Sequence, residues 1–161
     1  MKSSNQAPIL DKKQALVKAE HFCAYQERSQ KEVRSKLLDW GMRGDELEEI
    51  ISDLILNNFL NEERFAMNYV SGKFNIKKWG RIKIKQGLKL KGVPEKLLQK
   101  ALYSIDDDAY EKTLADLAVK KSNLLHEKDI FKRKMKLMYY LQSRGFENDL
   151  ILVVLKASNL N

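Results

Sequence analysis

The sequence predicts an all-α protein made of three tandem three-helix repeats, each about 50 residues long. The composition favours helix, because Lys, Leu, Glu and Ala recur throughout and the 161 residues include only two prolines and seven glycines. A glycine followed by an apolar residue, a signal that ends helices, occurs three times at spacings of 51 and 53 residues, at Gly41, Gly92 and Gly145. We expect these glycines to form the structural corners of the repeats.

The residues around the three glycines also align. A leucine stands four residues before each glycine, and an apolar residue stands six residues after it. Two further apolar positions follow nine and ten residues after each glycine. The aligned residues are Leu37, Leu88 and Leu141 before the glycines, and Leu47, Leu98 and Ile151 followed by Ile50/Ile51, Ala101/Leu102 and Val154/Leu155 after them. So many shared features in three copies are hard to obtain by chance, and they define the repeat.

Residues 1–11 are polar and are expected to form a flexible N-terminal tail before repeat 1, residues 12–60. The first helix begins near Lys12, and Cys23 lies on its apolar pattern as a buried thiol.

The spacing Ser29-x-x-Glu32 is typical of a capping box and predicts that the second helix starts at Ser29 and runs to Gly41. A third helix carries the apolar positions from Leu47 to Ile55.

Repeat 2 spans residues 61–105 and repeat 3 spans residues 106–161. Pro94 suits the first turn of a helix, where no amide donor is needed. Asp106, Asp107 and Asp108 suit a helix start better than a metal site, because carboxylates favour helix N-termini. The predicted helices lie near 61–75, 79–91 and 94–104 in repeat 2, and near 107–123, 128–144 and 147–157 in repeat 3.

The segment from Ile82 to Lys91 presents a conflict. Its apolar residues alternate with a period of two, which alone predicts a β-hairpin turning at Gln86-Gly87. Gln-Gly is a weak turn pair, and the corresponding segments of the other repeats are helical in composition. We therefore predict a helix, in which Gly87 costs about 1 kcal/mol relative to alanine.

The positive charge of the protein is concentrated in one segment, Lys73–Lys91, which we name the lysine block. It holds eight of the 30 basic residues, and the rest of the chain has 22 basic and 22 acidic residues. This concentration favours an anionic partner. Phe74 and Trp79 lie within the block and either stack on single-stranded bases or anchor the helices to the core, and we expect the anchoring role.

The sequence lacks the patterns of common catalytic and metal sites. It has no Walker loop, no GxGxxG, no Gly-x-Ser-x-Gly elbow and no zinc-ligand spacing around its two histidines. No apolar run is long enough for a membrane span, no secretory signal is present, and one cysteine excludes an internal disulfide. We expect a cytoplasmic protein that is not an enzyme and uses no cofactor or metal.

Four motifs in order give the chain a family resemblance. They are Arg28-Ser29-x-x-Glu32-Val33-x-x-Lys36-Leu37, Phe59-Leu60-Asn61-Glu62-Glu63-Arg64-Phe65-Ala66, Gly80 with Ile84, Leu88 and Lys91-Gly92-Val93, and Leu141-x-x-Arg144-Gly145-Phe146. With these motifs at repeat spacing, the chain resembles the RecX family of bacterial RecA regulators. It departs from the family pattern at Gly87, where an acidic residue is usual, and at Glu62 and Glu63, where aspartate is common.

The resemblance implies an elongated, curved body that binds RecA filaments on single-stranded DNA and inhibits their growth, ATPase and strand exchange. It implies no catalytic residue, and we expect a monomer that also touches single- or double-stranded DNA phosphates. The candidate RecA- or DNA-binding residues are Arg28, Lys31, Arg34, Lys36, Lys73, Lys77, Lys78, Arg81, Lys83, Lys85, Lys89, Lys91 and Arg144.

An alternative function is non-specific binding of single-stranded nucleic acid without RecA, since the corners resemble helix-turn-helix joints. The helices after the corners are apolar or acidic, which disfavours reading of a major groove. Because exposed substitutions rarely change stability, replacing Lys83, Lys85 and Lys89 by Glu is predicted to weaken partner binding and preserve the fold.

Overall fold

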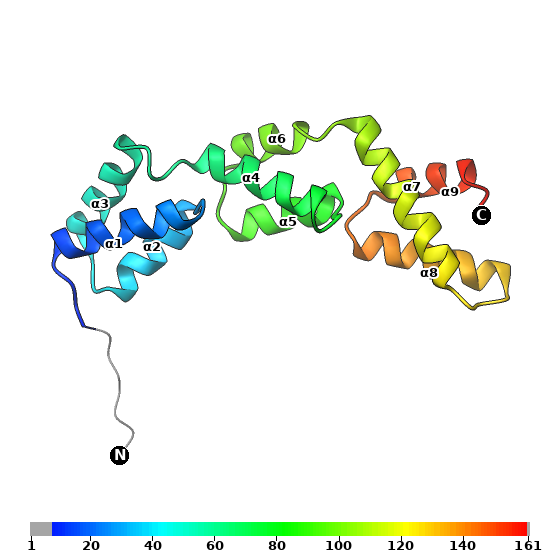
Figure 1. The fold of residues 1–161 in the computed structure, drawn as a ribbon, viewed down its shortest axis with the longest axis horizontal. Coiled ribbons are helices and arrows are strands. Elements are labelled where there is room, and N and C mark those ends of the chain that lie inside the picture. The colour runs from blue at the N-terminus through cyan, green and yellow to red at the C-terminus, as the bar shows by residue number, and fades with distance from the viewer. Residues whose placement is uncertain (1–7, 161) are drawn as a thin grey trace, which may run out of the picture.

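The computed structural model describes residues 8–160, in which nine helices and no strand form an elongated, gently curved body (Figure 1). The all-α prediction and the three predicted three-helix repeats are confirmed. The helices are α1 (Lys12–Tyr25), α2 (Gln30–Asp39), α3 (Gly44–Leu56), α4 (Glu62–Asn75), α5 (Arg81–Leu90), α6 (Glu95–Tyr103), α7 (Asp107–Leu124), α8 (Ile130–Ser143) and α9 (Asn148–Ala157).

Each helix packs chiefly on the other two helices of its own repeat, which are α1–α3, α4–α6 and α7–α9. The second helices of the three repeats, α2, α5 and α8, follow one another along one side of the molecule (Figure 1). The N-termini of α2 and α5 each lie near the corner that ends the second helix of the next repeat, where Lys31 reaches the Leu90 carbonyl and Gly80 reaches the Arg144 carbonyl.

Local capping signals fix where the helices begin. The predicted capping box of α2 is present, because the Glu32 amide donates to Ser29 Oγ at 3.2 Å and the Ser29 amide donates to Glu32 Oε2 at 2.9 Å. Asp106 caps α7 by accepting from the Ala109 amide, as its position predicted. Pro94 stands one residue earlier than predicted, at the N-cap of α6.

The three corner glycines close their helices as predicted. Gly41, Gly92 and Gly145 have φ values of +90°, +75° and +95°. In each corner the amide of the following residue donates to the carbonyl of the leucine four residues before the glycine, for example Met42 to Leu37 at 2.9 Å. This pattern satisfies carbonyls that the helix end leaves unpaired.

Gly87 lies inside α5, so the helix prediction was right. The sequence indicated only an energetic cost for this glycine, and the structure gives its reason. A Cβ at position 87 would lie 2.0 Å from the Tyr69 hydroxyl oxygen, because Tyr69 of α4 packs across α5 at this point. The missing side chain allows the two helices to approach.

The buried apolar residues form two separate cores. One core lies within repeat 1 and includes Val33, Leu37 and the buried Cys23. The other runs without interruption through repeats 2 and 3, from Phe65 to Leu155. Repeats 2 and 3 therefore share a core, whereas repeat 1 joins them mainly through polar contacts.

Residues 1–7 of the predicted flexible tail lie outside the described residues. The end of that predicted tail packs on repeat 1, where the Leu10 amide donates to the Trp40 carbonyl at 3.1 Å and Ile9 covers Gly41. Asp11 forms a second capping box with Gln14 at the start of α1, which the sequence analysis did not identify.

Candidate interaction surface

The structure divides the thirteen candidate cations into three groups. Five of them contact a neighbouring repeat: Lys31, Arg81, Lys83, Lys91 and Arg144. Four contact partners within their own repeat: Arg28, Arg34, Lys73 and Lys85. The remaining four are exposed and make no ion pair or cation–π contact within residues 8–160: Lys36, Lys77, Lys78 and Lys89. Most of the candidate cations therefore hold the protein together.

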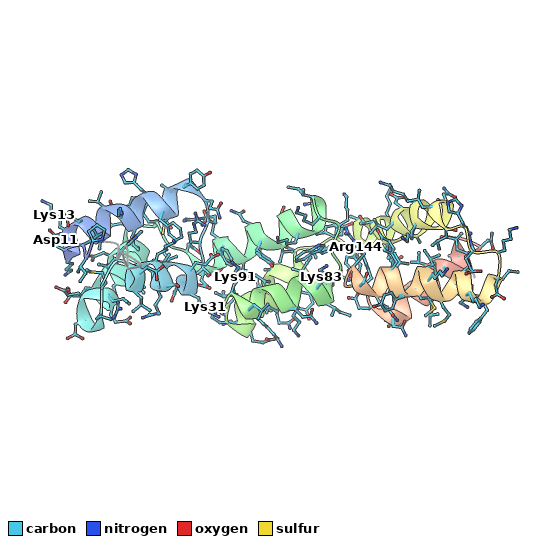
Figure 2. The ribbon with its side chains drawn as sticks, turned by 90° about the horizontal axis from the view of Figure 1, so that it is seen from below. Asp11, Lys13, Lys31, Lys83, Lys91 and Arg144 are labelled. Atoms are coloured by element: carbon cyan, nitrogen blue, oxygen red, sulfur yellow. The ribbon has the colours of Figure 1, made fainter. Side chains whose placement is uncertain are left out.

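The joint between repeats 1 and 2 is polar. Lys91 Nζ lies 2.5 Å from Glu32 Oε1, and Lys31 Nζ donates to the Leu90 carbonyl at 2.8 Å (Figure 2). The amide of Gln30, the first residue of α2, donates to Glu62 Oε2 at 2.9 Å. Charged and hydrogen-bonding groups thus take the place of a shared apolar core here.

These contacts shift the pKa values of two carboxyl groups in opposite directions. Burial disfavours the ionised form of Glu32, but hydrogen bonds from Lys91 and Ser29 outweigh burial and hold its pKa below the usual value. Burial raises the pKa of Glu62, and the hydrogen bond from the Gln30 amide only partly opposes that effect. Glu32 is therefore the firmly ionised partner in this joint.

The joint between repeats 2 and 3 is a direct backbone contact. The Gly80 amide donates to the Arg144 carbonyl at 2.8 Å, and the Ile82 amide donates to the Gly145 carbonyl at 3.0 Å. A Cβ on Gly80 would lie 2.3 Å from the Gly145 carbonyl. The Arg144 guanidinium donates to the carbonyls of Lys77 and Lys78, so the Arg144 side chain also bridges repeats 2 and 3. Arg144 is labelled where these two repeats meet in Figure 2.

Tyr110 fills the apolar side of this joint. Its ring is fully buried, with centroid distances of 5.7 Å to Phe74 and 5.2 Å to Phe146. Its hydroxyl donates to Glu147 at 2.6 Å and accepts from the Arg81 amide at 2.9 Å. Burial and the Glu147 hydrogen bond raise the Tyr110 pKa far above its usual range, so the phenol stays neutral.

Neither aromatic residue of the lysine block is open to a base. Phe74 is buried, and Trp79 is half-buried with the Nζ atoms of Lys73 and Lys83 at 4.7 and 4.6 Å from its ring centroid. The structure agrees with the anchoring interpretation of both residues.

A second basic segment was not among the sequence-based predictions. Residues 120–144 contain eight basic and two acidic residues. The count over the whole chain concealed this surplus, because residues 44–56 carry five acidic and no basic residues and cancel most of it. Counting charge in a sliding window would have found this segment.

A groove of about 580 Å³ lies between α7 and α8 within this basic segment. Its lining is mostly apolar with lysines at the edge, and consists of Lys121, Leu125, Met135, Lys136, Tyr139, Tyr140 and Ser143. Tyr139 is 75% exposed, while the Lys121 Nζ lies 4.8 Å from the Tyr140 ring centroid.

Between residues 8 and 160, no three His, Cys, Asp or Glu side chains gather as a metal site would require. Across the same residues, no helix combines the length and apolar character needed to cross a membrane. What the arrangement offers a partner is a long surface on which Lys36, Lys77, Lys78 and Lys89 are exposed and unpaired within residues 8–160.

Three family models match the chain, in the order of its repeats. They describe the first three-helix domain of RecX (residues 15–54), the second (residues 61–102) and the third (residues 107–155). Each match covers the three helices of one structural repeat, apart from a few residues at its ends.

Curated relatives named regulatory protein RecX support this match. The protein of Clostridium perfringens strain 13 is 37% identical over 124 residues, which are 76% of this chain and 58% of the relative. The protein of Prosthecochloris aestuarii is 30% identical over 141 residues, which are 88% of this chain and 91% of the relative. The matched part thus spans only about three fifths of the clostridial relatives, but nearly all of the Prosthecochloris one.

Solved structures share the fold. The crystal structure of RecX from Lactobacillus salivarius superposes with a TM-score of 0.85 at 27% identity and covers 93% of this chain and 97% of that one. A second RecX crystal structure has a TM-score of 0.83 at 21% identity over 90% of this chain and 73% of that one, which supports the fold alone. With a family model on each repeat, and a relative matched over almost its whole length, this chain belongs to the RecX family.

Proposed function

We propose that this protein regulates DNA recombination and repair by binding RecA filaments on single-stranded DNA and inhibiting their growth, ATPase and strand exchange. The observation that carries this proposal is the match of all three repeats to RecX domains. The regulatory character of the family is stated in the names of the relatives, and the RecA partner follows from the resemblance of the repeat motifs.

The shape of the molecule supports an occupancy mechanism. Three repeats in a row expose a long side made of α2, α5 and α8 (Figure 1). A rod-like protein of this kind inhibits by covering a surface along a polymer or at its growing end. One apolar core joins repeats 2 and 3, which make up two thirds of this rod.

The electrostatics support an anionic partner. Lys36, Lys77, Lys78 and Lys89 remain exposed and unpaired within residues 8–160, so they are available to phosphates of DNA or to carboxylates of RecA. Lysine ammonium groups are point charges without base-reading geometry, which suits a partner bound independently of DNA sequence.

The test is the single-strand-dependent ATPase of RecA with substoichiometric amounts of this protein, together with electron microscopy of filament length. We expect a lower ATPase rate and shorter filaments. An unchanged rate with unchanged filament lengths would refute the proposal.

Added excess single-stranded DNA serves as the control for sequestration. If excess DNA fully restores the ATPase rate, the protein acts by binding DNA alone, which is the alternative function.

A further inference from the structure

Helix α8 differs from its counterparts in the other repeats. It has 14 residues, whereas α2 and α5 have 10 each, and the additional turn lies at its N-terminus. With the corner glycines aligned, Arg133 takes the place of Gly80. The Gly80 amide binds the corner of the next repeat, but the Arg133 amide donates to the Asp129 carbonyl within its own helix at 2.9 Å. The Arg133 amide therefore makes no contact of the Gly80 kind, and this face of α8 is open to solvent within the described residues.

The exposed face of α8 carries apolar and aromatic residues at helical spacing. Phe131, Met135 and Tyr139 stand four residues apart and are 71%, 49% and 75% exposed. The aligned positions in repeat 2 are Lys78, Ile82 and Gln86, and those in repeat 1 are Glu27, Lys31 and Ser35. The aromatic residues are thus specific to repeat 3 among the three repeats, and large exposed apolar groups gathered on one face indicate a partner.

Cations surround this stripe. As the helical positions require, Lys132 and Lys136 flank it on one side and Lys134 on the other. Lys121 of α7 lines the adjoining groove, and Lys128 lies in the loop before α8. The two carboxylates close to the stripe are already engaged, since Glu127 pairs with Lys136 at 2.9 Å and Asp129 caps α8 at the Lys132 amide. The hydrogen bond from Lys136 also keeps the pKa of Glu127 below its usual value. The local field therefore favours an anion.

We propose that this face of α8, together with the adjoining α7–α8 groove, binds single-stranded nucleic acid. The rings of Phe131 and Tyr139 stack on unpaired bases, and the surrounding lysines bind the phosphates. Eight helical residues separate the two rings, which places them about 12 Å apart along α8. A strand of a few nucleotides spans that distance.

The residue types select a single strand over other partners. Lysine is depleted in protein–protein interfaces, whereas lysines interleaved with aromatic rings are typical of single-strand sites. A duplex keeps its bases stacked inside and offers no base face to these rings. The lysine block lacks this combination, because Phe74 is buried and two lysines cover Trp79.

The proposal does not require RecA and is tested without it. The probe is a fluorescent oligothymidylate of roughly 15 nucleotides, the length of a large single-strand site, followed by fluorescence anisotropy at several salt concentrations. We expect each of Phe131→Ala and Tyr139→Ala to weaken binding about 5- to 100-fold. Tyr103→Ala is the matched control, since Tyr103 is 84% exposed on α6 and should have no effect.

Charge substitutions locate the phosphate interactions. Lys132→Gln with Lys134→Gln should reduce the salt dependence of the binding constant by roughly 0.7 in log–log slope for each phosphate that is no longer neutralised. Lys13→Gln with Lys96→Gln, at two exposed lysines outside both basic segments, should leave it unchanged. The opposite result, with a change only in the Lys13 and Lys96 variant, would overturn the proposal.

Photocrosslinking of the unaltered protein to a bromouracil-containing strand tests the site without any amino-acid substitution. We expect mass spectrometry to find the crosslinks at Phe131 or Tyr139. Crosslinks confined to other repeats, equal affinity for duplex DNA, or no oligonucleotide binding at low salt would each contradict the site. If the oligonucleotide does not bind but the α8 variants lose inhibition of RecA, the face contacts protein instead, and the proposed regulation would stand.

Discussion

The substitution Gly80→Ala tests the close backbone contact between repeats 2 and 3, because a methyl group at this position must push the two backbones apart. The Cβ of Gly80→Ala would lie 2.3 Å from the Gly145 carbonyl and 2.4 Å from the Phe146 amide nitrogen, where ordinary contact begins near 3.4 Å. The joint has to open by about 1 Å, which is too far for the interrepeat hydrogen bonds at 2.8 and 3.0 Å to survive.

The expected loss of stability follows from these contacts. Two backbone hydrogen bonds contribute roughly 0.5–1.5 kcal/mol each, and alanine is a poorer N-cap than glycine by about 0.5–1 kcal/mol. Gly80→Ala should therefore lower the free energy of unfolding by about 1.5–4 kcal/mol. Urea unfolding followed by circular dichroism measures this difference.

Gly72→Ala provides a control with the opposite sign. Gly72 lies inside α4, and no atom lies within 4 Å of the position that an added methyl group would take, so alanine should raise helix stability by up to about 1 kcal/mol. If Gly80→Ala is as stable as the unaltered protein while Gly72→Ala behaves as expected, the backbone contact between the repeats is not as close as described.

Four further predictions concern particular residues. Glu32→Gln should weaken the joint between repeats 1 and 2 by up to about 1 kcal/mol. Because the folded-state pKa of Glu32 is depressed, the stability that its carboxylate contributes should be full above its unfolded-state pKa and should disappear as the pH falls through the lower folded-state value. Urea unfolding at a series of pH values measures both effects. Gly87→Ala should destabilise the protein alone but stabilise it by about 1 kcal/mol in a Tyr69→Ala background, and equal effects in both backgrounds would argue against the Tyr69 contact. Lys83→Glu should lower thermal stability, because the Lys83 ammonium lies at the Ser143 carbonyl and over the Trp79 ring, whereas Lys89→Glu should leave the thermal stability unchanged. The expectation that replacing Lys83, Lys85 and Lys89 by Glu preserves the fold is revised accordingly. Burial raises the pKa of the Cys23 thiol to about 11, so alkylation near neutral pH should be slow in the folded protein and fast after unfolding in urea, and rapid labelling of the folded protein would contradict its burial.

Local sequence signals determined most of the helical architecture. The corners at Gly41, Gly92 and Gly145, the capping box at Ser29 and the cap at Asp106 were all predicted, because each depends on residues within one or two turns. Helix ends were less certain, and α5 is one or two residues shorter at each end than the predicted 79–91. Predicting the helix that contains Gly87 required comparison with the other repeats, because the alternating apolar pattern of this segment favoured a hairpin.

Tertiary structure alone decided how the cations are used and how the repeats join. Lys31 reaches the Leu90 carbonyl and Arg144 reaches the Lys77 carbonyl across about 60 or more residues of chain, a pairing that no local pattern encodes. The same holds for Gly80, whose lack of a side chain matters only because the Gly145 backbone packs against it. The aromatic face of α8 could not be predicted from the sequence for a related reason. Phe131 and Tyr139 resemble ordinary apolar residues of a helix, and only the tertiary packing shows that they lie outside the core.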